Sequence, residues 1–232
     1  MSSRHGAGGE GVTVASSRLS SWKPWLADAA TLLSDAERAR AARMKHARDA
    51  EDRMLAYALH RLVLGRLLSM DPCDVPLTRD RHGCPCVEGQ ACQTSLSHAR
   101  DAVAIAVSTA GPVGVDIEHA SRAASMEAIA DEVLHPSERI DPDHPRAQRG
   151  QSLLETWVRK EAYLKASGVG LLVPMPGFAL HQGEPMRLAP HPDEGVRDAV
   201  VSTTLLSLLP GYALALTCAP GVEVQSMRVE PA

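Results

Sequence analysis

The sequence predicts an α+β protein, and three observations carry that prediction. A helical pattern spans residues 49–70, where Leu or Val recurs every fourth residue along one face. Two apolar runs, at residues 102–108 and 113–118, are typical of strands buried inside a sheet. The last third, from residue 178 onward, alternates short β-like segments with Pro and Gly turns.

The first half of the chain is expected to begin with a flexible leader, residues 1–11. Ser34 is a good N-cap for the Arg-rich helical segment that follows it. Asp71-Pro72 stops the long helix, because the residue before a proline disfavours helical backbone. The strands expected in this half, besides the first apolar run, are residues 12–19, 75–78 and 94–99.

The second half again mixes helices and strands. We place the join near Gly111-Pro112, so that residues 12–110 and 111–232 form two α+β halves. Helices are predicted at residues 126–133 and 152–167, separated by a polar, Pro-rich loop, and no internal repeat is visible in the sequence itself. Besides the second apolar run, the expected strands are residues 178–182, 199–209, 212–218 and 222–230.

Composition and charge narrow the class of protein. With 44% hydrophobic and 22% charged residues among 232, the chain is typical of a globular protein. A net charge of −4 lacks the basic excess of a nucleic-acid-binding protein, so no nucleic-acid partner is predicted. No apolar run reaches the roughly 18 to 20 residues that span a bilayer, and the leader lacks the apolar region of a signal peptide. We therefore expect a cytoplasmic monomer with no membrane partner.

Five cysteines at irregular spacing do not suggest a disulfide framework. Cys84, Cys86, Cys92 and His98 allow a zinc site to be considered. However, structural zinc sites use two well-spaced ligand pairs, and a single residue separates Cys84 from Cys86. Ordinary thiols near a turn are the favoured interpretation.

The stretch "GVDIE" places two acids near the end of a buried strand. Side chains alternate along a strand, so Asp116 and Glu118 face one side while Val115 and Ile117 point into the core. Two neighbouring carboxylates repel each other unless water or a cation separates them, and Mg²⁺ prefers such oxygen ligands. The alternative is a pair of solvated acids at a strand end.

The stretch "WVRKEAYLKASGVGL" places Glu161 and Lys165 on the side of a helix that also carries Trp157. Glu161 is a candidate third metal carboxylate, and Lys165, one turn further on, is placed to meet a phosphate. Gly168 and Gly170 end the helix and allow backbone to approach a ligand closely. Three acids, a lysine and a glycine turn suggest metal-assisted phosphoryl or pyrophosphate chemistry. The alternative for Glu161 and Lys165 is an ordinary i,i+4 surface ion pair.

Together these two stretches resemble the paired signature of the 4′-phosphopantetheinyl transferases, G-[VI]-D-[VI]-E and W-x-x-K-E-[AS]-x-x-K-x-x-G-x-G. The segment "SLSHA" at residues 95–99 is similar to the family's S-x-S-H segment, and "LSDAERARAARM" and "ALHRLVLGRLL" resemble its N-terminal helices. The resemblance covers nearly the whole chain and points to the larger, Sfp-like type. It implies two similar α+β halves in one chain, related by a pseudo-twofold axis.

The resemblance implies an enzyme that moves 4′-phosphopantetheine from coenzyme A to a serine of an apo acyl or peptidyl carrier protein. Adenosine 3′,5′-bisphosphate is the expected by-product. Asp116, Glu118 and Glu161 are the implied ligands of Mg²⁺, with Mn²⁺ as a substitute. Glu161 is also the implied base for the serine, and Lys165 the group that neutralises charge on the leaving side.

The resemblance also implies contacts to coenzyme A. Arg40, Arg53, His98, Lys160 and Lys165 are the expected cofactor-binding residues. For His98 the alternative is a histidine satisfied by backbone, and for either arginine a solvated charged face. Relatives often have Gly-Lys-Pro where this chain has Gly83-Cys84-Pro85, and Arg79 or Arg81 is the expected substitute for the missing lysine.

Two alternatives to the transferase stay open at this point. A metal-dependent nuclease or phosphohydrolase also uses strand carboxylates and a lysine, but usually with the lysine two residues after an acid on a strand. The other alternative is a module that binds coenzyme A or a carrier protein without catalysis.

Residues 119–151 are the expected docking surface for the carrier protein. Met126, Ile129 and Val133 are expected to form the apolar side of this surface or, alternatively, to pack in the core.

Overall fold

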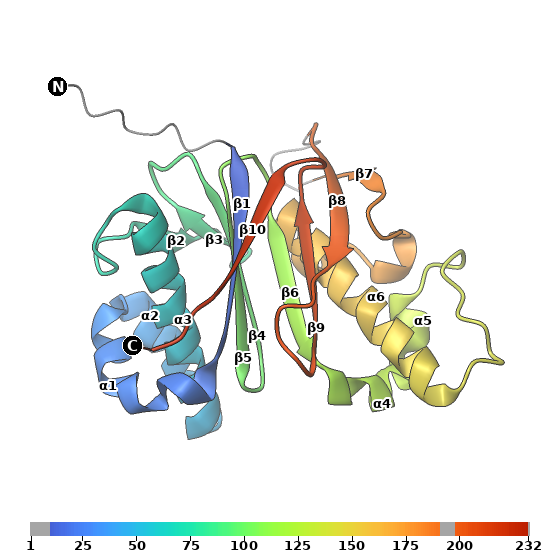
Figure 1. Ribbon diagram of the computed structural model, residues 1–232, viewed down its shortest axis with the longest axis horizontal. Coiled ribbons are helices and arrows are strands. Elements are labelled where there is room, and N and C mark those ends of the chain that lie inside the picture. The colour runs from blue at the N-terminus through green and yellow to red at the C-terminus, as the bar shows by residue number, and fades with distance from the viewer. Residues whose placement is uncertain (1–9, 191–197, 232) are drawn as a thin grey trace.

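The computed structural model describes residues 10–190 and 198–231 (Figure 1). Two four-stranded sheets lie next to each other in the centre, with a group of helices on the outer side of each. Each sheet packs against its own long helix, and a third cluster of apolar side chains fills the space between the sheets. The prediction of a mixed α+β protein is confirmed. Among the described residues, no helix is long and apolar enough to cross a membrane.

The first sheet has the strand order β10-β1-β5-β4 and lies under three helices. The last strand runs parallel to the first, while the other neighbours are antiparallel. A small separate hairpin, β2-β3, lies beside this half. The elements are β1 (Gly11–Arg18), α1 (Leu26–Leu32), α2 (Asp35–Ala42), α3 (Ala47–Leu68), β2 (Leu77–Arg79), β3 (Pro85–Val87), β4 (Gln93–Ala99), β5 (Ala102–Ser108) and β10 (Glu223–Arg228).

The second sheet has the order β6-β9-β8-β7 and is antiparallel throughout. One long helix, α6, covers it, and two single-turn helices pack against α6 or its flanking loops. The elements are β6 (Gly114–His119), α4 (Ala123–Met126), α5 (Ala130–Val133), α6 (Arg146–Ser167), β7 (Pro185–Arg187), β8 (Val200–Leu205) and β9 (Tyr212–Cys218). Short 3-10 turns are η1 (Leu19–Trp25), η2 (Ala120–Arg122), η3 (Glu127–Ile129), η4 (Gly170–Leu172) and η5 (Met175–Gly177).

Strand β5 explains why the sheets pack so closely. All seven of its residues are buried, as predicted for a continuous apolar run. Its alanines face the second sheet, whereas Val103, Ile105 and Val107 face α3. Small side chains on one face let the two sheets approach, and large ones on the other fill the gap to the helix.

Helices α2 and α3 form largely where the sequence predicts. Ser34 caps α2 through a capping box, in which Ser34 and Glu37 each bond the other's backbone N–H. Leu55 and Leu59 on α3 are buried, but Leu67, on the same predicted face, is 41% exposed. Leu67 lines a hollow between the end of α3 and the sheet, so it is not covered by packing as Leu55 and Leu59 are.

Helix α6 lies directly on the backbone of β6. A Cβ built on Gly114 would lie 1.9 Å from the carbonyl oxygen of Ala162, so only glycine allows this approach. The helix starts at Arg146, six residues earlier than predicted, because Pro145 is compatible with the start of a helix. Gly168 ends it in the left-handed region, with φ 71°.

Two expectations for the second half are wrong in detail. The helix expected over residues 126–133 is broken into α4, η3 and α5. The strand expected at residues 178–182 is absent from the described structure, since side chains rather than a neighbouring strand hold this backbone: Phe178 O accepts from Lys160, and Leu180 N donates to Glu138. The division at residues 110 and 111 stays a prediction, and β10 crosses it by pairing with β1.

Candidate active site

The acids of β6 face the helix, as the alternation predicts. Val115 and Ile117 lie in the apolar cluster between the sheets, so Asp116 and Glu118 point the other way, toward α6. Strand β6 is an edge strand of its sheet and lies next to β4, the edge of the first sheet. Ser95 of β4 accepts a hydrogen bond from the Val115 backbone across this junction, at 3.1 Å. The acids therefore lie where the two halves meet.

Asp116 is the centre of the cluster. Only 6% exposed, its Oδ1 accepts from Lys165 Nζ at 2.6 Å and from Ser97 Oγ at 2.7 Å. Lys165 also donates to the carbonyl of Val115, at 3.2 Å. Lys165 therefore pairs with the buried carboxylate of Asp116 and not with Glu161 in an exposed i,i+4 pair. The alternative of an ordinary surface ion pair is wrong for Lys165.

Glu118 pairs with a residue that the sequence analysis missed. Arg122, just after the strand, donates to Glu118 and stacks over Trp157, with 4.5 Å between the guanidinium carbon and the ring centroid. Trp157 therefore holds a cation beside the site as well as packing α6. The four-residue spacing of Glu118 and Arg122 could have suggested this ion pair only weakly, because the two residues lie in different elements, a strand and a 3-10 turn.

Glu161 lies in an environment that favours the protonated form of its carboxyl group. Burial raises the pKa of its carboxyl, and the nearby charge of Asp116 raises it further, while Lys165 and Arg122 act in the opposite direction. A general base works best when its pKa approaches the working pH, so this environment suits proton transfer. Asp116 and Glu161 are thus electrostatically coupled across the contact between β6 and α6.

The chemistry of these side chains fits a hard divalent cation. Carboxylates are the donors that Mg²⁺ prefers, and repulsion between Asp116 and Glu161 is what a bound cation relieves. However, no three His, Cys, Asp or Glu side chains of the described chain already meet as a metal-binding group. Lys165 and Arg122 neutralise the acids instead. The metal ligand set stays a prediction.

A cationic cluster adjoins the carboxylates on the side of the first half. The pKa of the Arg79 guanidinium is lowered, first by burial and then in part by the charges of Arg40 and Arg53. Burial, Arg53 and Lys165 lower the pKa of His98 to about 4. Among the described residues, the buried Nε of Arg53 has no hydrogen-bond partner. Because these cations lie close enough to repel one another, the cluster is suited to bind an anion that carries several negative charges.

Arg79, the expected substitute for the missing lysine, lies beside the turn at Gly83 and Cys84. Its guanidinium lies 5.2 Å from the centroid of the Tyr57 ring and donates to Gly83 O at 2.6 Å. The neighbouring Cys84 contacts the carbonyl of Gly168, with 3.8 Å between sulfur and oxygen. The turn where relatives carry a lysine therefore lies beside the C-terminal end of α6, close to Lys165.

The role predicted for Lys160 is corrected. Its side chain has no exposed surface, and its ammonium donates to the carbonyls of Val133, Met175 and Phe178 at 2.7–2.8 Å. Glu138 lies 2.5 Å away as its counter-ion. Lys160 points away from the carboxylates and cannot contact coenzyme A in this position.

The docking residues also need correction. Met126 and Val133 are fully buried and belong to the core around α6, and Ile129 packs partly buried against it. The alternative of ordinary core packing is therefore the right one for Met126 and Val133. The surface of this region is formed by other side chains.

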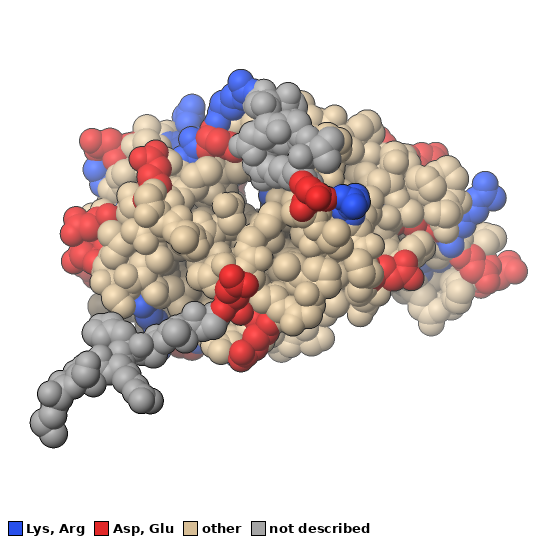
Figure 2. Space-filling model, turned by 90° about the horizontal axis from the view of Figure 1, so that it is seen from above, with Lys and Arg blue, Asp and Glu red and all other residues tan. Residues whose placement is uncertain are grey.

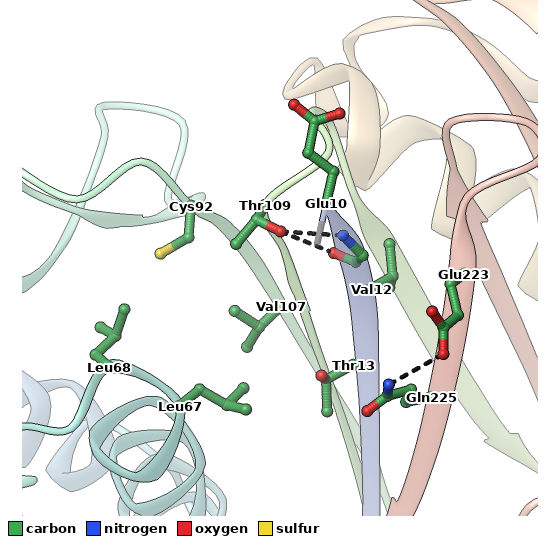
Figure 3. Close-up of a pocket in the computed structure, with 11 residues that line it drawn as sticks. Glu10, Val12, Thr13, Leu67, Leu68, Cys92, Val107, Thr109, Glu223 and Gln225 are labelled. Atoms are coloured by element: carbon green, nitrogen blue, oxygen red, sulfur yellow. Dashed lines mark hydrogen bonds between the residues drawn. The ribbon is translucent and has the colours of Figure 1, made fainter. Parts of the chain in front are cut away.

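The remaining hollows lie apart from this site. One of about 230 Å³ lies between the end of α3 and β1, β5 and β10, lined on one side by Leu67 and Leu68 and on the other by Thr13, Glu223 and Gln225 (Figure 3). Small-molecule sites usually enclose about 300–1,000 Å³, so it is small for a cofactor. On the face seen in Figure 2, basic and acidic side chains lie in separate small groups, not in one continuous basic field.

Comparison with known proteins supports the resemblance seen in the sequence. The family model described as "4'-phosphopantetheinyl transferase superfamily" matches residues 112–217, which include β6 and α6. The chain is 28% identical over 151 residues to the 4′-phosphopantetheinyl transferase HetI of Nostoc sp., covering 63% of this chain and 64% of the relative. It is 30% identical over 144 residues to the transferase gsp of Aneurinibacillus migulanus, covering 61% and 59%.

A third relative is the transferase Sfp of Bacillus subtilis, 28% identical over 156 residues, with 66% of this chain and 68% of the relative covered. The aligned part thus spans less than two thirds of HetI and of gsp. The matched region carries both sequence motifs on which the resemblance was based. The resemblance is therefore confirmed: the superfamily model matches residues 112–217, and each of these three relatives is called a 4′-phosphopantetheinyl transferase.

Proposed function

We propose that this protein transfers the 4′-phosphopantetheine group from coenzyme A to a serine of an apo acyl or peptidyl carrier protein. The relatives named above support this, since each is called a 4′-phosphopantetheinyl transferase. The observation that carries the proposal is the junction between the halves. There a carboxylate cluster with Lys165 adjoins a group of cations formed by Arg40, Arg53, Arg79 and His98.

Asp116, Glu118 and Glu161 would hold Mg²⁺, or Mn²⁺ in its place. When bound, the metal would neutralise charge on the pyrophosphate of coenzyme A. Ser97 fixes one oxygen of Asp116, so that carboxylate is oriented before any ligand arrives. Lys165 and Arg122 balance the acids in the protein alone and would exchange these partners for phosphate oxygens.

The chemistry assigned to the chain is a proton transfer and a charge stabilisation. Glu161 takes the proton of the carrier serine as the serine oxygen bonds to the β-phosphorus of coenzyme A. The bond from that phosphorus to the bridging oxygen breaks, and adenosine 3′,5′-bisphosphate leaves with the bond's electron pair. Lys165 stabilises the charge that develops on the leaving side.

The cationic cluster would bind the phosphates of coenzyme A. Arg53 has an unsatisfied buried N–H, and the nearby charges of Arg40 and Arg53 help to lower the pKa of Arg79. A bound phosphate would relieve this repulsion and would favour protonation of His98. The monomeric state and the cytoplasmic location are part of this proposal.

We further propose that the two halves correspond, as the pseudo-twofold arrangement requires. Helices α3 and α6 both have 22 residues and both end at a residue with left-handed backbone, Ser69 or Gly168. Each helix covers its own four-stranded sheet. Valines or isoleucine of β1 and of β6 meet in the cluster between the sheets.

The test is direct. The purified protein is mixed with coenzyme A, Mg²⁺ and a panel of apo carrier domains, and intact-protein mass spectrometry follows addition of phosphopantetheine to serine. We expect transfer that EDTA abolishes and added Mg²⁺ restores. Absence of transfer to every carrier, or hydrolysis of coenzyme A or nucleic acid instead, would overturn the proposal.

A further inference from the structure

Two buried ion pairs lie outside the candidate active site, one in each half. In the first, Arg61 Nε donates to Glu37 Oε2 at 2.7 Å, and the Arg61 residue is 3% exposed. In the second, Lys160 and Glu138 lie 2.5 Å apart. Each cation lies fourteen residues after the first residue of its helix, α3 or α6. We name these the Arg61–Glu37 pair and the Lys160–Glu138 pair.

The two pairs bind the backbone in the same way. Arg61 donates to three carbonyls, those of Pro72, Cys73 and Val75, at 3.0–3.4 Å. Lys160 likewise donates to three carbonyls in the loops that flank α6. Each glutamate also accepts a backbone N–H three residues before it, from Ser34 or from His135. Each pair therefore joins its long helix to two separate segments of its own half.

The segments held by the Arg61–Glu37 pair carry the cationic cluster. Glu37 lies in α2, the helix that also contains Arg40. The three carbonyls bound by Arg61 lead into β2, which ends at Arg79. This pair therefore sets how far Arg40 and Arg79 stand from α3, on which Arg53 lies.

The segments held by the Lys160–Glu138 pair lie on the opposite side of the carboxylates. Lys160 fixes the end of α5, and Glu138 accepts from Leu180 N at 2.8 Å. Directly after Glu138 the chain lines an open hollow along the outside of α6, formed by residues that include Arg139, Ile140 and Gln151. The cationic cluster is formed by residues of the first half, whereas all residues that line this hollow belong to the second half.

We propose that the two pairs position different substrates: the Arg61–Glu37 pair sets the coenzyme A side of the site, and the Lys160–Glu138 pair sets the surface that receives the carrier domain. This inference rests on the proposed function. Neither pair touches the reacting atoms, so Lys160, Glu138, Arg61 and Glu37 are positioning residues.

The test compares two matched double variants, Lys160→Met with Glu138→Gln and Arg61→Met with Glu37→Gln. Methionine keeps the length of the side chain, and glutamine keeps an acceptor for the backbone N–H without leaving a buried charge unpaired. Thermal unfolding is measured first, and KM for coenzyme A, KM for an accepted apo carrier domain and kcat are then measured for each. Single variants Glu138→Asp and Glu37→Asp, which shorten the side chain but keep the charge of each pair, serve where a double variant does not fold.

The expected result is a crossed pattern. The Lys160–Glu138 variant raises KM for the carrier about tenfold, with KM for coenzyme A within about twofold of wild type, and the Arg61–Glu37 variant does the reverse. Equal changes in both constants, or no change in either, would overturn this inference while the wild-type protein stays active. If the wild-type protein itself transfers nothing, the proposed function fails instead.

Discussion

The two sheets and the long helices that cover them share several features but carry different charged residues. In each, a strand that begins Gly-Val lies under a 22-residue helix with a buried cation at the same position. In the second half that strand continues with Asp116 and Glu118; in the first half, Thr13 and Ala15 follow its Gly-Val at the same distance. The residue after the buried cation is Glu161 in one helix and Leu62 in the other.

This difference shows where chemistry was placed on a common scaffold. In the first half, Ala15 packs in the core against α3, and Thr13 lines the small hollow of Figure 3. Burying carboxylates in such an apolar environment would cost free energy, because they would lose their contact with water. In the second half the acids lie at the junction, where Lys165 and Arg122 offset their charge. The first half contributes cations instead.

The strongest test of this contrast is the pair Glu161→Gln and Leu62→Gln. We expect Glu161→Gln to lower kcat by about 10²- to 10⁴-fold, because a general base is lost without a change of shape. Leu62→Gln, the matched change in the first half, is expected to leave kcat within a few-fold. Rates of carrier modification by mass spectrometry give both numbers. Equal losses in the two variants would contradict an active role confined to the second half.

The close contact between β6 and α6 predicts the next largest effect. Gly114→Ala places a methyl group 1.9 Å from Ala162 O, so the helix must shift and carry Glu161 and Lys165 away from Asp116. We expect a loss of about 3 kcal/mol in the free energy of unfolding. Gly177→Ala is the control, since nothing lies within 4 Å of the added atom. Urea denaturation measures both, and similar stabilities for the two variants would count against the observed contact.

The contribution of the first half is tested by Arg79→Ala. Loss of a charge-assisted phosphate contact is expected to raise KM for coenzyme A about tenfold, with kcat little changed. Arg66→Ala, an exposed arginine on α3 of the same half, is expected to leave KM unchanged. The effect of Arg79→Ala on KM for coenzyme A should shrink at high salt, which screens the charge of its phosphates. A fall in kcat alone would place Arg79 in the chemistry rather than in binding.

The smallest expected effect concerns His60, in the first-half core. Burial, Arg79 and Arg61 lower the pKa of its imidazole to about 3, and Thr94 Oγ1 lies 2.7 Å from its Nε2. Because the unfolded chain binds this proton near its ordinary pKa of about 6.5, the stability that neutral His60 contributes is complete above that pH and falls as pH drops. The limiting slope is about 1.4 kcal/mol per pH unit.

This pH dependence can be isolated with His60→Gln. Unfolding free energies at pH 7, 6 and 5 should fall less steeply for His60→Gln than for wild type, and the His60 imidazole should stay neutral at pH 5 by NMR. An imidazole that titrates near pH 6 would show that the histidine is not held in a dry core.

The sequence predicted the parts of the site that depend on local order. Alternation along β6 sufficed to place Asp116 and Glu118 on one face, and helical spacing placed Glu161 and Lys165 on one side of α6. The partners could not be predicted in this way. Ser97, Arg122 and Glu138 come from other elements, and nothing in local spacing says that they approach the acids or the lysine. Lys160 was assigned to coenzyme A because helical spacing alone does not distinguish a side chain in the interior from one at the site.

The sequence by itself determined the mixed fold, the family resemblance and the shared face of Asp116 and Glu118, because periodicity and motif spacing are properties of neighbouring residues along the chain. The tertiary structure decided which cation meets which acid, that the cationic cluster belongs to the first half, and that Lys160 is an internal anchor. These outcomes depend on the packing of two sheets and on one glycine that lets a helix touch a strand. Contacts between residues far apart in the chain become visible only once that packing is known.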